Sequence, residues 1–206
     1  MKKVLLTLTV IVAGLSMTAL DTDAQNTSRQ SRRQQEMLKW HQEMEEFKAR
    51  SAERREINEL TDSIAGVQAA AAVQNRDFVL EADQVTFKNG NTVFVNSNTT
   101  FISVKGNRAV VQISPSNFSA GPNGVGGVTV DGSISGMQRM VDKKGRTTIS
   151  FNVTGIGINA QIEVYMTPGT NRASATIYPN FNSNTVWVEG DIVPYQNSDV
   201  FEGMSL

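Results

Sequence analysis

Two pairs of carboxylates are the first residues in this sequence whose spacing could support chemistry. Glu81 and Asp83 form one pair, and Glu189 and Asp191 form the other. Residues two apart on a β-strand point to the same side, so each pair would place two carboxylates together. Such groups could bind a cation or act as an acid and a base, but they also suit the solvated face of a strand. A glycan hydrolase would need two carboxyl groups about 5 to 9.5 Å apart in a cleft.

Trp187 and Tyr165 are the residues whose surroundings suggest contact with a ligand. Each falls on the polar side of an alternating segment, Trp187 near Glu189 and Tyr165 near Glu163. Aromatic rings exposed among amides and carboxylates can stack on sugars, and the same rings can instead cover a packed helix. Trp187 and Tyr165 are therefore the candidate ligand contacts, with packing as the alternative.

Several common catalytic and metal sites are incompatible with the composition. The chain has no cysteine and a single histidine, His41, which excludes thiolate chemistry, a histidine-containing catalytic triad and a multi-histidine metal site. Gly155-Ile-Gly157 matches the start of a dinucleotide fingerprint, but a strand pattern follows where a helix is required. The segment from Gly121 to Gly127 lacks the lysine of a phosphate loop. We predict a noncatalytic protein with no cofactor and no metal.

Residues 1–24 are typical of a signal peptide. A basic start precedes the apolar run from Val4 to Leu20, and Ala24 is a suitable last residue before cleavage. The alternative is a retained anchor, because the apolar run is close to the roughly 17-residue lower limit for crossing a bilayer. Without cysteine, the new amino terminus cannot carry a lipoprotein anchor. We predict a periplasmic or exported protein that begins at Gln25 and keeps no integral membrane segment.

Residues 25–75 form a charged segment with a helical composition. It contains eight basic and eight acidic residues, no proline, and Gly66 as its one glycine. The formal net charge of the whole chain is −1, which gives no long-range attraction to nucleic acid. We therefore predict an amphipathic N-terminal helical arm and no nucleic-acid partner.

Two apolar stripes run along this arm at the three-four spacing of a helix, and a slip between them interrupts a continuous coiled-coil seam. We expect the second stripe to dock on the domain that follows. The first stripe is the candidate surface for self-association or for an envelope protein partner, because the mixed charges around it do not suit a membrane-lying helix. The first stripe is Met37, Trp40, Met44 and Phe47, and the second is Ile57, Leu60, Ile64, Val67 and Ala71.

Residues 76–206 have the composition and the hydrophobic pattern of an antiparallel β domain. Between Arg146 and Met166 apolar and polar residues alternate with period two, which indicates half-buried strands around a reversal at Gly155-Ile-Gly157. Short turn signals join the segments, and none of the connections is long enough for a crossover helix. We predict about nine strands: Phe78–Phe87, Thr92–Val95, Thr100–Val104, Ala109–Ser114, Gly127–Met140, Arg146–Thr154, Ile158–Met166, Ala173–Tyr178 and Thr185–Val193.

A meander of this length needs protection for its edges. The fold class is therefore mainly β, as an up-and-down barrel or a two-layer sandwich. Small residues on the presumed inner face leave room, which would be a ligand cavity in a barrel or a site of close packing in a sandwich. These small residues are Gly132, Ala160, Ala173, Ala175 and Gly190.

Three segments carry a resemblance to a known family: Phe78-Val-Leu-Glu-Ala-Asp83, Gly121-Pro-Asn-Gly-Val-Gly-Gly127 and Phe151-Asn-Val-Thr-Gly-Ile-Gly157. Over about residues 75–206 the chain resembles a secreted family of Gram-negative, Bacteroidetes-type bacteria that is known only as a domain of unknown function. The resemblance implies an extracytoplasmic β domain, and it supplies no activity and no functional residue.

The sequence thus favours a noncatalytic extracytoplasmic module for binding or assembly. Two alternatives stay open. The small inner residues suit a lipocalin-like carrier of a small apolar ligand, and the carboxylate pairs suit a glycan hydrolase.

Overall fold

The computed structural model describes residues 2–114, 127–155, 159–180 and 184–203. Helix α1 (Lys2–Asn75) opens the chain, and side chains within it are described at Arg29 and from Arg32 onward. The chain divides into two units, Met1–Ile57 and Asn58–Leu206. The predicted limits of a signal peptide and of a separate arm stay predictions. Among the described residues, no helix has both the length and the apolar character needed to cross a membrane.

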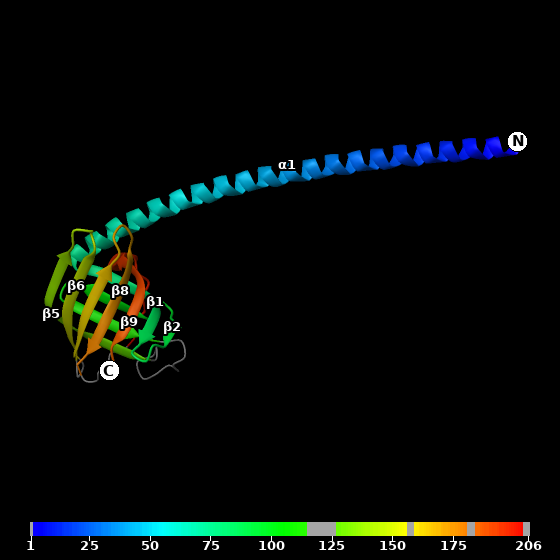
Figure 1. Ribbon diagram of the computed structural model, residues 1–206. Helices are drawn as coiled ribbons and strands as arrows, with labels where there is room; N and C mark the ends of the chain where they lie inside the picture. Colours follow the sequence, from blue (N-terminus) through cyan, green and yellow to red (C-terminus); the bar gives the residue numbers. More distant parts are fainter. Residues whose placement is uncertain (1, 115–126, 156–158, 181–183, 204–206) are drawn as a thin grey trace. The chain divides into compact units, whose positions relative to one another are not determined.

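In the part of the chain that the structure describes, nine antiparallel strands follow α1, which confirms the mainly β fold (Figure 1). Along the sheet their order is β2-β1-β3-β4-β5-β6-β7-β8-β9, and β1 also pairs with β9. Eight strands therefore close into a barrel, with β2 as an additional strand on β1, and the sandwich alternative does not apply. The strands are β1 (Asp77–Phe87), β2 (Thr92–Phe94), β3 (Phe101–Lys105), β4 (Arg108–Ile113), β5 (Val128–Val141), β6 (Thr147–Gly155), β7 (Asn159–Met166), β8 (Arg172–Pro179) and β9 (Val186–Pro194).

The barrel closes along β1, whose length lets it serve two neighbours on one edge. Its first half pairs with β3 and its second half with β2, while the whole strand pairs with β9 on the other edge. The register with β9 shifts between Ala82 and Gln84, which is a β-bulge. Opposite the bulge, a Cβ atom on Gly190 would lie 1.9 Å from the Glu81 carbonyl oxygen, so closure at this seam requires glycine.

The predicted hairpin of β6 and β7 forms one wall of the core. Ile149 pairs with Val164 and Phe151 pairs with Ile162, and all four side chains are buried. Their polar neighbours along each strand point outward, as period two requires. The predicted reversal at residues 156–158 lies outside the described residues.

The C-terminal turns of α1 belong to the same hydrophobic core as the barrel. Ala69, Ala72 and Val73 are buried in one cluster with the inward residues of the strands. The helix ends at Asn75, and the next residue, Arg76, has a left-handed φ of 55° that reverses the chain into β1. The Arg76 carbonyl oxygen then accepts a hydrogen bond of 2.7 Å from the Gly106 amide in the β3–β4 turn. The helix therefore covers the barrel end at which β1 begins.

The docking face of α1 is not the one predicted. Leu60, Ile64 and Val67 are 60%, 60% and 70% exposed, and Ile57 and Ala71 are exposed as well. The side that packs on the barrel carries Gly66, Ala69, Ala72 and Val73 instead. At about 100° per residue these positions lie on the opposite side of the helix from the large aliphatic stripe. The prediction was wrong because small side chains let the helix backbone approach the barrel closely.

The chain after β9 covers part of the outside of the barrel. It begins with η1 (Tyr195–Asn197), and Val200 and Tyr195 pack on a small outer cluster of Val79, Phe101 and Val110. Outward residues of β1, β3 and β4 are therefore apolar where this segment crosses them. In this region β1, β3 and β4 are therefore packed on both faces, against the barrel core on the inside and against the C-terminal segment on the outside.

Candidate ligand-binding cavity

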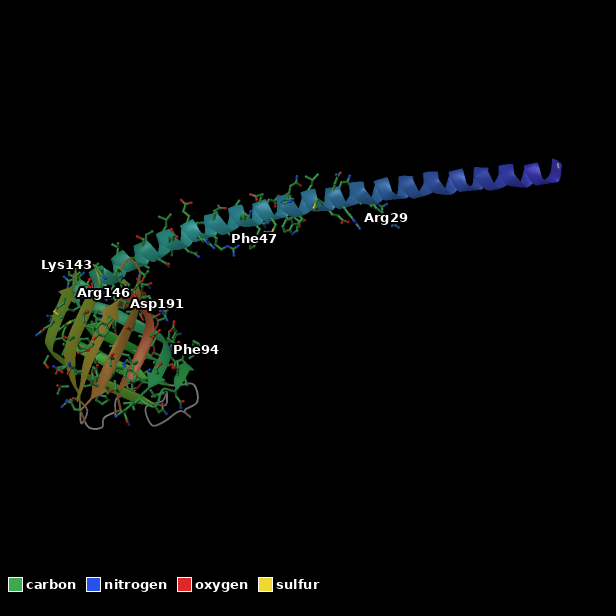
Figure 2. All side chains as sticks on the ribbon, viewed as in Figure 1. Arg29, Phe47, Phe94, Lys143, Arg146 and Asp191 are labelled. Carbon is green, nitrogen blue, oxygen red and sulfur yellow. The ribbon has the colours of Figure 1, made fainter. Side chains whose placement is uncertain are left out.

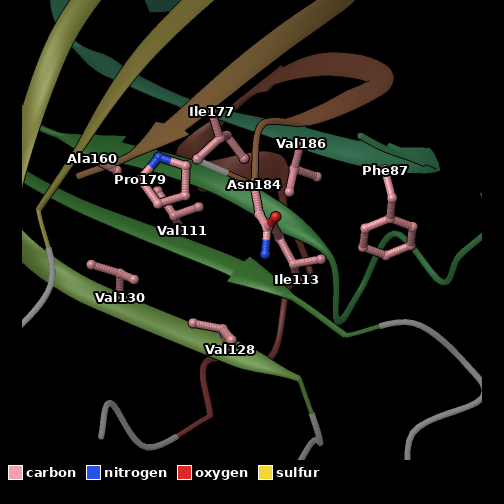
Figure 3. Close-up of a pocket in the computed structure, with 10 residues that line it drawn as sticks. All are labelled: Phe87, Val111, Ile113, Val128, Val130, Ala160, Ile177, Pro179, Asn184 and Val186. Carbon is pink, nitrogen blue, oxygen red and sulfur yellow. The ribbon is translucent and has the colours of Figure 1, made fainter. Parts of the chain in front are cut away.

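An apolar cavity of about 250 Å³ lies inside the barrel at the end away from the docked helix (Figure 3). At this end β1, β4, β6 and β8 finish and β5, β7 and β9 begin. Nine of the ten lining residues are apolar, and the tenth is Asn184. The lining comprises Phe87, Val111, Ile113, Val128, Val130, Ala160, Ile177, Pro179, Asn184 and Val186.

The cavity exists because one wall of the barrel ends in a small side chain. Along β7 the inward positions are Ala160, Ile162, Val164 and Met166, and Ala160 is the one that lines the cavity. Its neighbours across the sheet are Val153 and Pro179. A methyl group where the other inward positions of the strand carry larger side chains leaves space that the surrounding residues do not fill.

The other small inner residues have a packing role. A Cβ atom on Gly132 would lie 2.4 Å from the Thr154 carbonyl oxygen, so glycine is needed for close approach of β5 and β6. Ala173 and Ala175 are buried in the core cluster that includes the end of α1, and neither lines the cavity. Both predicted explanations therefore apply, with Ala160 making room and the remaining small residues allowing close packing.

The lining determines which chemistry is available. It contains no ionisable side chain, so it supplies neither an acid nor a base for a reaction. It offers a carbon surface, on which binding is driven by removal of apolar area from water. The Asn184 amide is the one side chain of the lining that can both donate and accept hydrogen bonds.

A second hollow of about 400 Å³ adjoins the cavity and is more polar. It shares Phe87, Asn184 and Val186 with the cavity, so the two spaces meet at these residues. Lys88, Asn89 and Thr185 complete its lining. The lining is therefore apolar in the cavity, whereas in the adjoining hollow it includes amide, hydroxyl and ammonium groups. The residues that carry these polar groups lie one or two positions along the chain from Phe87 and Val186.

The predicted carboxylate pairs are not part of the cavity lining. Asp83 receives two hydrogen bonds from the Arg172 guanidinium, whose Nη2 lies 2.9 Å from Asp83 Oδ1, and Arg172 Nη1 lies 3.7 Å from Asp191 Oδ1. Hydrogen bonding to Asp83 raises the pKa of Arg172, which keeps this charge in place. Glu81 accepts a hydrogen bond of 2.6 Å from Ser198 Oγ. Three of the four carboxylates therefore have protein partners that tie strands and the C-terminal segment together.

Trp187 and Tyr165 lie on the outside of the barrel. Trp187 on β9 is 41% exposed between Thr176 and Thr86 of the neighbouring strands, and Tyr165 on β7 is 43% exposed. The Tyr165 hydroxyl donates a hydrogen bond of 2.7 Å to Glu163 Oε2, which raises the pKa of Tyr165. Neither ring lines the cavity, and a role in ligand contact stays a prediction.

His41 is exposed on α1, where its ring meets the Trp40 ring edge-on at 5.1 Å between centroids. Over the part of the chain that the structure describes, no group of three or more histidine, aspartate and glutamate residues is placed to hold a metal ion. The glycine segment from Gly121 to Gly127 falls almost wholly outside the described residues.

Most of the cavity residues could not be identified from the sequence. Ala160 was identifiable as a small residue on an inner face, but Phe87, Ile113 and Val128 resemble any apolar residue at the end of a strand. The signal that could have singled them out is the lack of charged residues in the connections that follow or precede them, since Ser114–Gly127 and residues 180–185 contain none.

Comparison with known proteins places the fold in a family. The family model described as "Domain of unknown function (DUF4251)" matches residues 63–192. The crystal structure of a DUF4251 family protein from Bacteroides eggerthii is 46% identical, with a TM-score of 0.61, and the match covers 69% of this chain and 96% of that one. No curated protein matches the chain.

Proposed function

The chain belongs to the DUF4251 family, a domain family of unknown function, and we propose a role for it from its own cavity. It is a noncatalytic binding module that takes a small apolar group into the cavity of its barrel. The observation that carries the proposal is the cavity lining, in which nine of ten residues are apolar. Closed eight-stranded barrels have an interior just large enough to be filled by side chains or to hold one small ligand.

The cavity size sets the size of the ligand. An engineered apolar cavity of about 150 Å³ binds benzene, whereas pockets for drug-sized molecules are about 300–1,000 Å³. At about 250 Å³, this cavity suits a short alkyl chain or a substituted aromatic ring. A larger ligand would place only part of itself inside the barrel.

The proposal favours a carrier or sensor over a hydrolase. Asp83 and Asp191 share an arginine, and none of the four carboxylates lines the cavity. With the signal-peptide character of residues 1–24, the module is expected to work outside the cytoplasm. The general design is that of a lipocalin-like barrel, in which binding energy comes from buried carbon rather than from a reaction.

The test is a calorimetric titration of 1-octanol into the wild type and two matched variants. Val128 and Val141 stand at opposite ends of β5 and are both about half exposed, but only Val128 lines the cavity. We expect saturable binding of one octanol molecule to the wild type and to Val141→Asn, and clearly weaker binding to Val128→Asn. An absence of binding to the wild type would refute the proposed function.

A further inference from the structure

Among the described residues that line the apolar cavity and the adjoining hollow, Lys88 is the one charged side chain. The β5–β6 turn at the other end of the barrel carries Asp142, Lys143, Lys144 and Arg146. Lys88 is therefore the charge that a ligand in these two spaces would meet.

Lys88 stands where the apolar surface ends. Phe87 lines both the cavity and the adjoining hollow, and Lys88, the next residue, lines the hollow alone. The Lys88 side chain has no hydrogen bond or ion pair with any other residue that the structure describes. Its charge is thus not neutralised by a described carboxylate and is available to an anion in the hollow.

The backbone around Lys88 is held in a tight turn. The Phe87 amide donates to the Asn91 carbonyl oxygen at 2.9 Å, and the Gly90 amide donates to the Phe87 carbonyl oxygen at 2.8 Å. Gly90 has a φ of 84°, and the Asn89 Oδ1 accepts a hydrogen bond of 3.1 Å from the Asn91 amide. The turn fixes the place of the Lys88 Cα atom, so that the flexible part is the side chain alone.

Resting on the proposed function of the cavity, we propose that the ligand is an amphipathic carboxylate, with its alkyl or aryl part in the cavity and its carboxylate in the adjoining hollow beside Lys88. The apolar space and the polar hollow meet at Phe87, Asn184 and Val186, so one molecule can occupy both. The Asn184 amide, shared by both spaces, can donate a hydrogen bond to the carboxylate.

The test compares octanoate, 1-octanol and octylamine, which share a chain length and differ in charge, at pH 7 and low ionic strength. A charge pair at about 4 Å in a water-like medium corresponds to roughly a fivefold change in affinity. We expect the wild type to bind octanoate about fivefold more tightly than 1-octanol, and octylamine more weakly than either. The preference should decrease as salt is added.

Lys88 variants show whether this residue causes the preference. Lys88→Gln should bind octanoate and 1-octanol equally, Lys88→Arg should keep the preference, and Lys88→Glu should reverse it in favour of octylamine. Lys143→Gln, an exposed lysine in the β5–β6 turn, is the matched control and should behave as the wild type (Figure 2).

The outcomes separate this inference from the function on which it rests. If octanoate and 1-octanol bind the wild type equally, or if Lys88→Gln keeps the preference, the inference is overturned and the apolar cavity remains a binding site. If 1-octanol does not bind the wild type, the proposed function itself fails.

Discussion

The backbone of Gly66 in α1 lies directly against the backbone of Thr170 in the β7–β8 turn. A Cβ atom at position 66 would be 2.9 Å from the Thr170 nitrogen and 3.0 Å from the Gly169 carbonyl carbon. Both neighbours are main-chain atoms, which cannot move aside as the end of a flexible side chain can. At Gly66 the backbones of the helix and the barrel are thus in contact with no side chain between them.

Replacing Gly66 by leucine should push the end of α1 away from the barrel. Leucine favours a helix over glycine by almost 1 kcal/mol, but overpacking costs about 1–3 kcal/mol, so we expect net destabilisation. Urea unfolding followed by tryptophan fluorescence measures the free energy of unfolding. Ala70→Leu, at an exposed position of the same helix, is the control and should change stability by less than about 0.5 kcal/mol. Equal stability of the two variants would contradict the docking described here.

Replacing Gln112 should release the C-terminal segment from the barrel. This buried side chain donates to the carbonyl oxygens of Thr99 and Phe201 and accepts from Thr129 Oγ1 and the Gly203 amide. Gln112→Leu removes all four bonds, at about 1 kcal/mol each or less, so we expect a loss of about 2–4 kcal/mol. Faster hydrogen exchange at the amides of Phe201 and Gly203 should accompany it.

The control for this change is Gln138→Leu, because Gln138 is exposed on β5. It should leave both the stability and the exchange rates near the wild-type values. Unchanged exchange at Gly203 in Gln112→Leu would show that the network does not hold the segment.

The Tyr165 hydroxyl should titrate at a higher pH than a free tyrosine. Its hydrogen bond to the Glu163 carboxylate raises the pKa of Tyr165, so Glu163→Gln should lower that pKa toward its usual value of about 10. Because the folded-state pKa is the raised one, the associated stability is fully present below the unfolded pKa and is lost as pH rises through the folded pKa. Phenolate absorbance in a Tyr178→Phe, Tyr195→Phe background isolates Tyr165. A titration unaffected by Glu163→Gln would contradict the hydrogen bond.

The first apolar stripe of α1 is predicted to bring two copies of the chain together. Met37, Trp40 and Phe47 are 60%, 57% and 63% exposed, and Met44 is partly exposed. Large apolar side chains at three-four spacing are suited to a helical partner. We expect light scattering to give a higher mass for the chain from Gln25 than for the same chain without residues 25–55.

A point variant sharpens this prediction. Trp40→Glu should lower the mass in the same way, whereas Gln42→Glu, which adds the same charge at an exposed position outside the stripe, should not. Identical masses for the full and the shortened chain would rule out self-association through this part of the helix.

The strands were predictable because alternation is a local property. Residues two apart on a strand face the same side, and Ile149, Phe151, Ile162 and Val164 are buried together as this spacing predicts. The nine predicted segments coincide with the nine observed strands to within a few residues. Closure was not predictable in this way, since a barrel and a sandwich share the same inward and outward pattern. It depends on β1 meeting β9, two strands at opposite ends of the domain.

Helix docking shows where hydrophobicity alone misleads. The stripe of Leu60, Ile64 and Val67 is the more apolar side of α1, yet the barrel is contacted by Gly66 and Ala69. The choice between the two sides depends on how closely the backbones approach, which is a three-dimensional property. The cavity was predictable only in part. Small residues such as alanine mark where space can exist in the sequence, but the packing of the whole barrel determines that the space beside Ala160 stays unfilled.

The most direct measurement is a methyl NMR titration of the full chain with 1-octanol. If the cavity is the binding site, the methyl signals of Val111, Val130 and Ile177 will shift and saturate together, and those of Val104 and Val164, which do not line it, will stay in place. Shifts confined to Leu60 and Ile64 on the exposed side of α1, or none at all, would contradict the account.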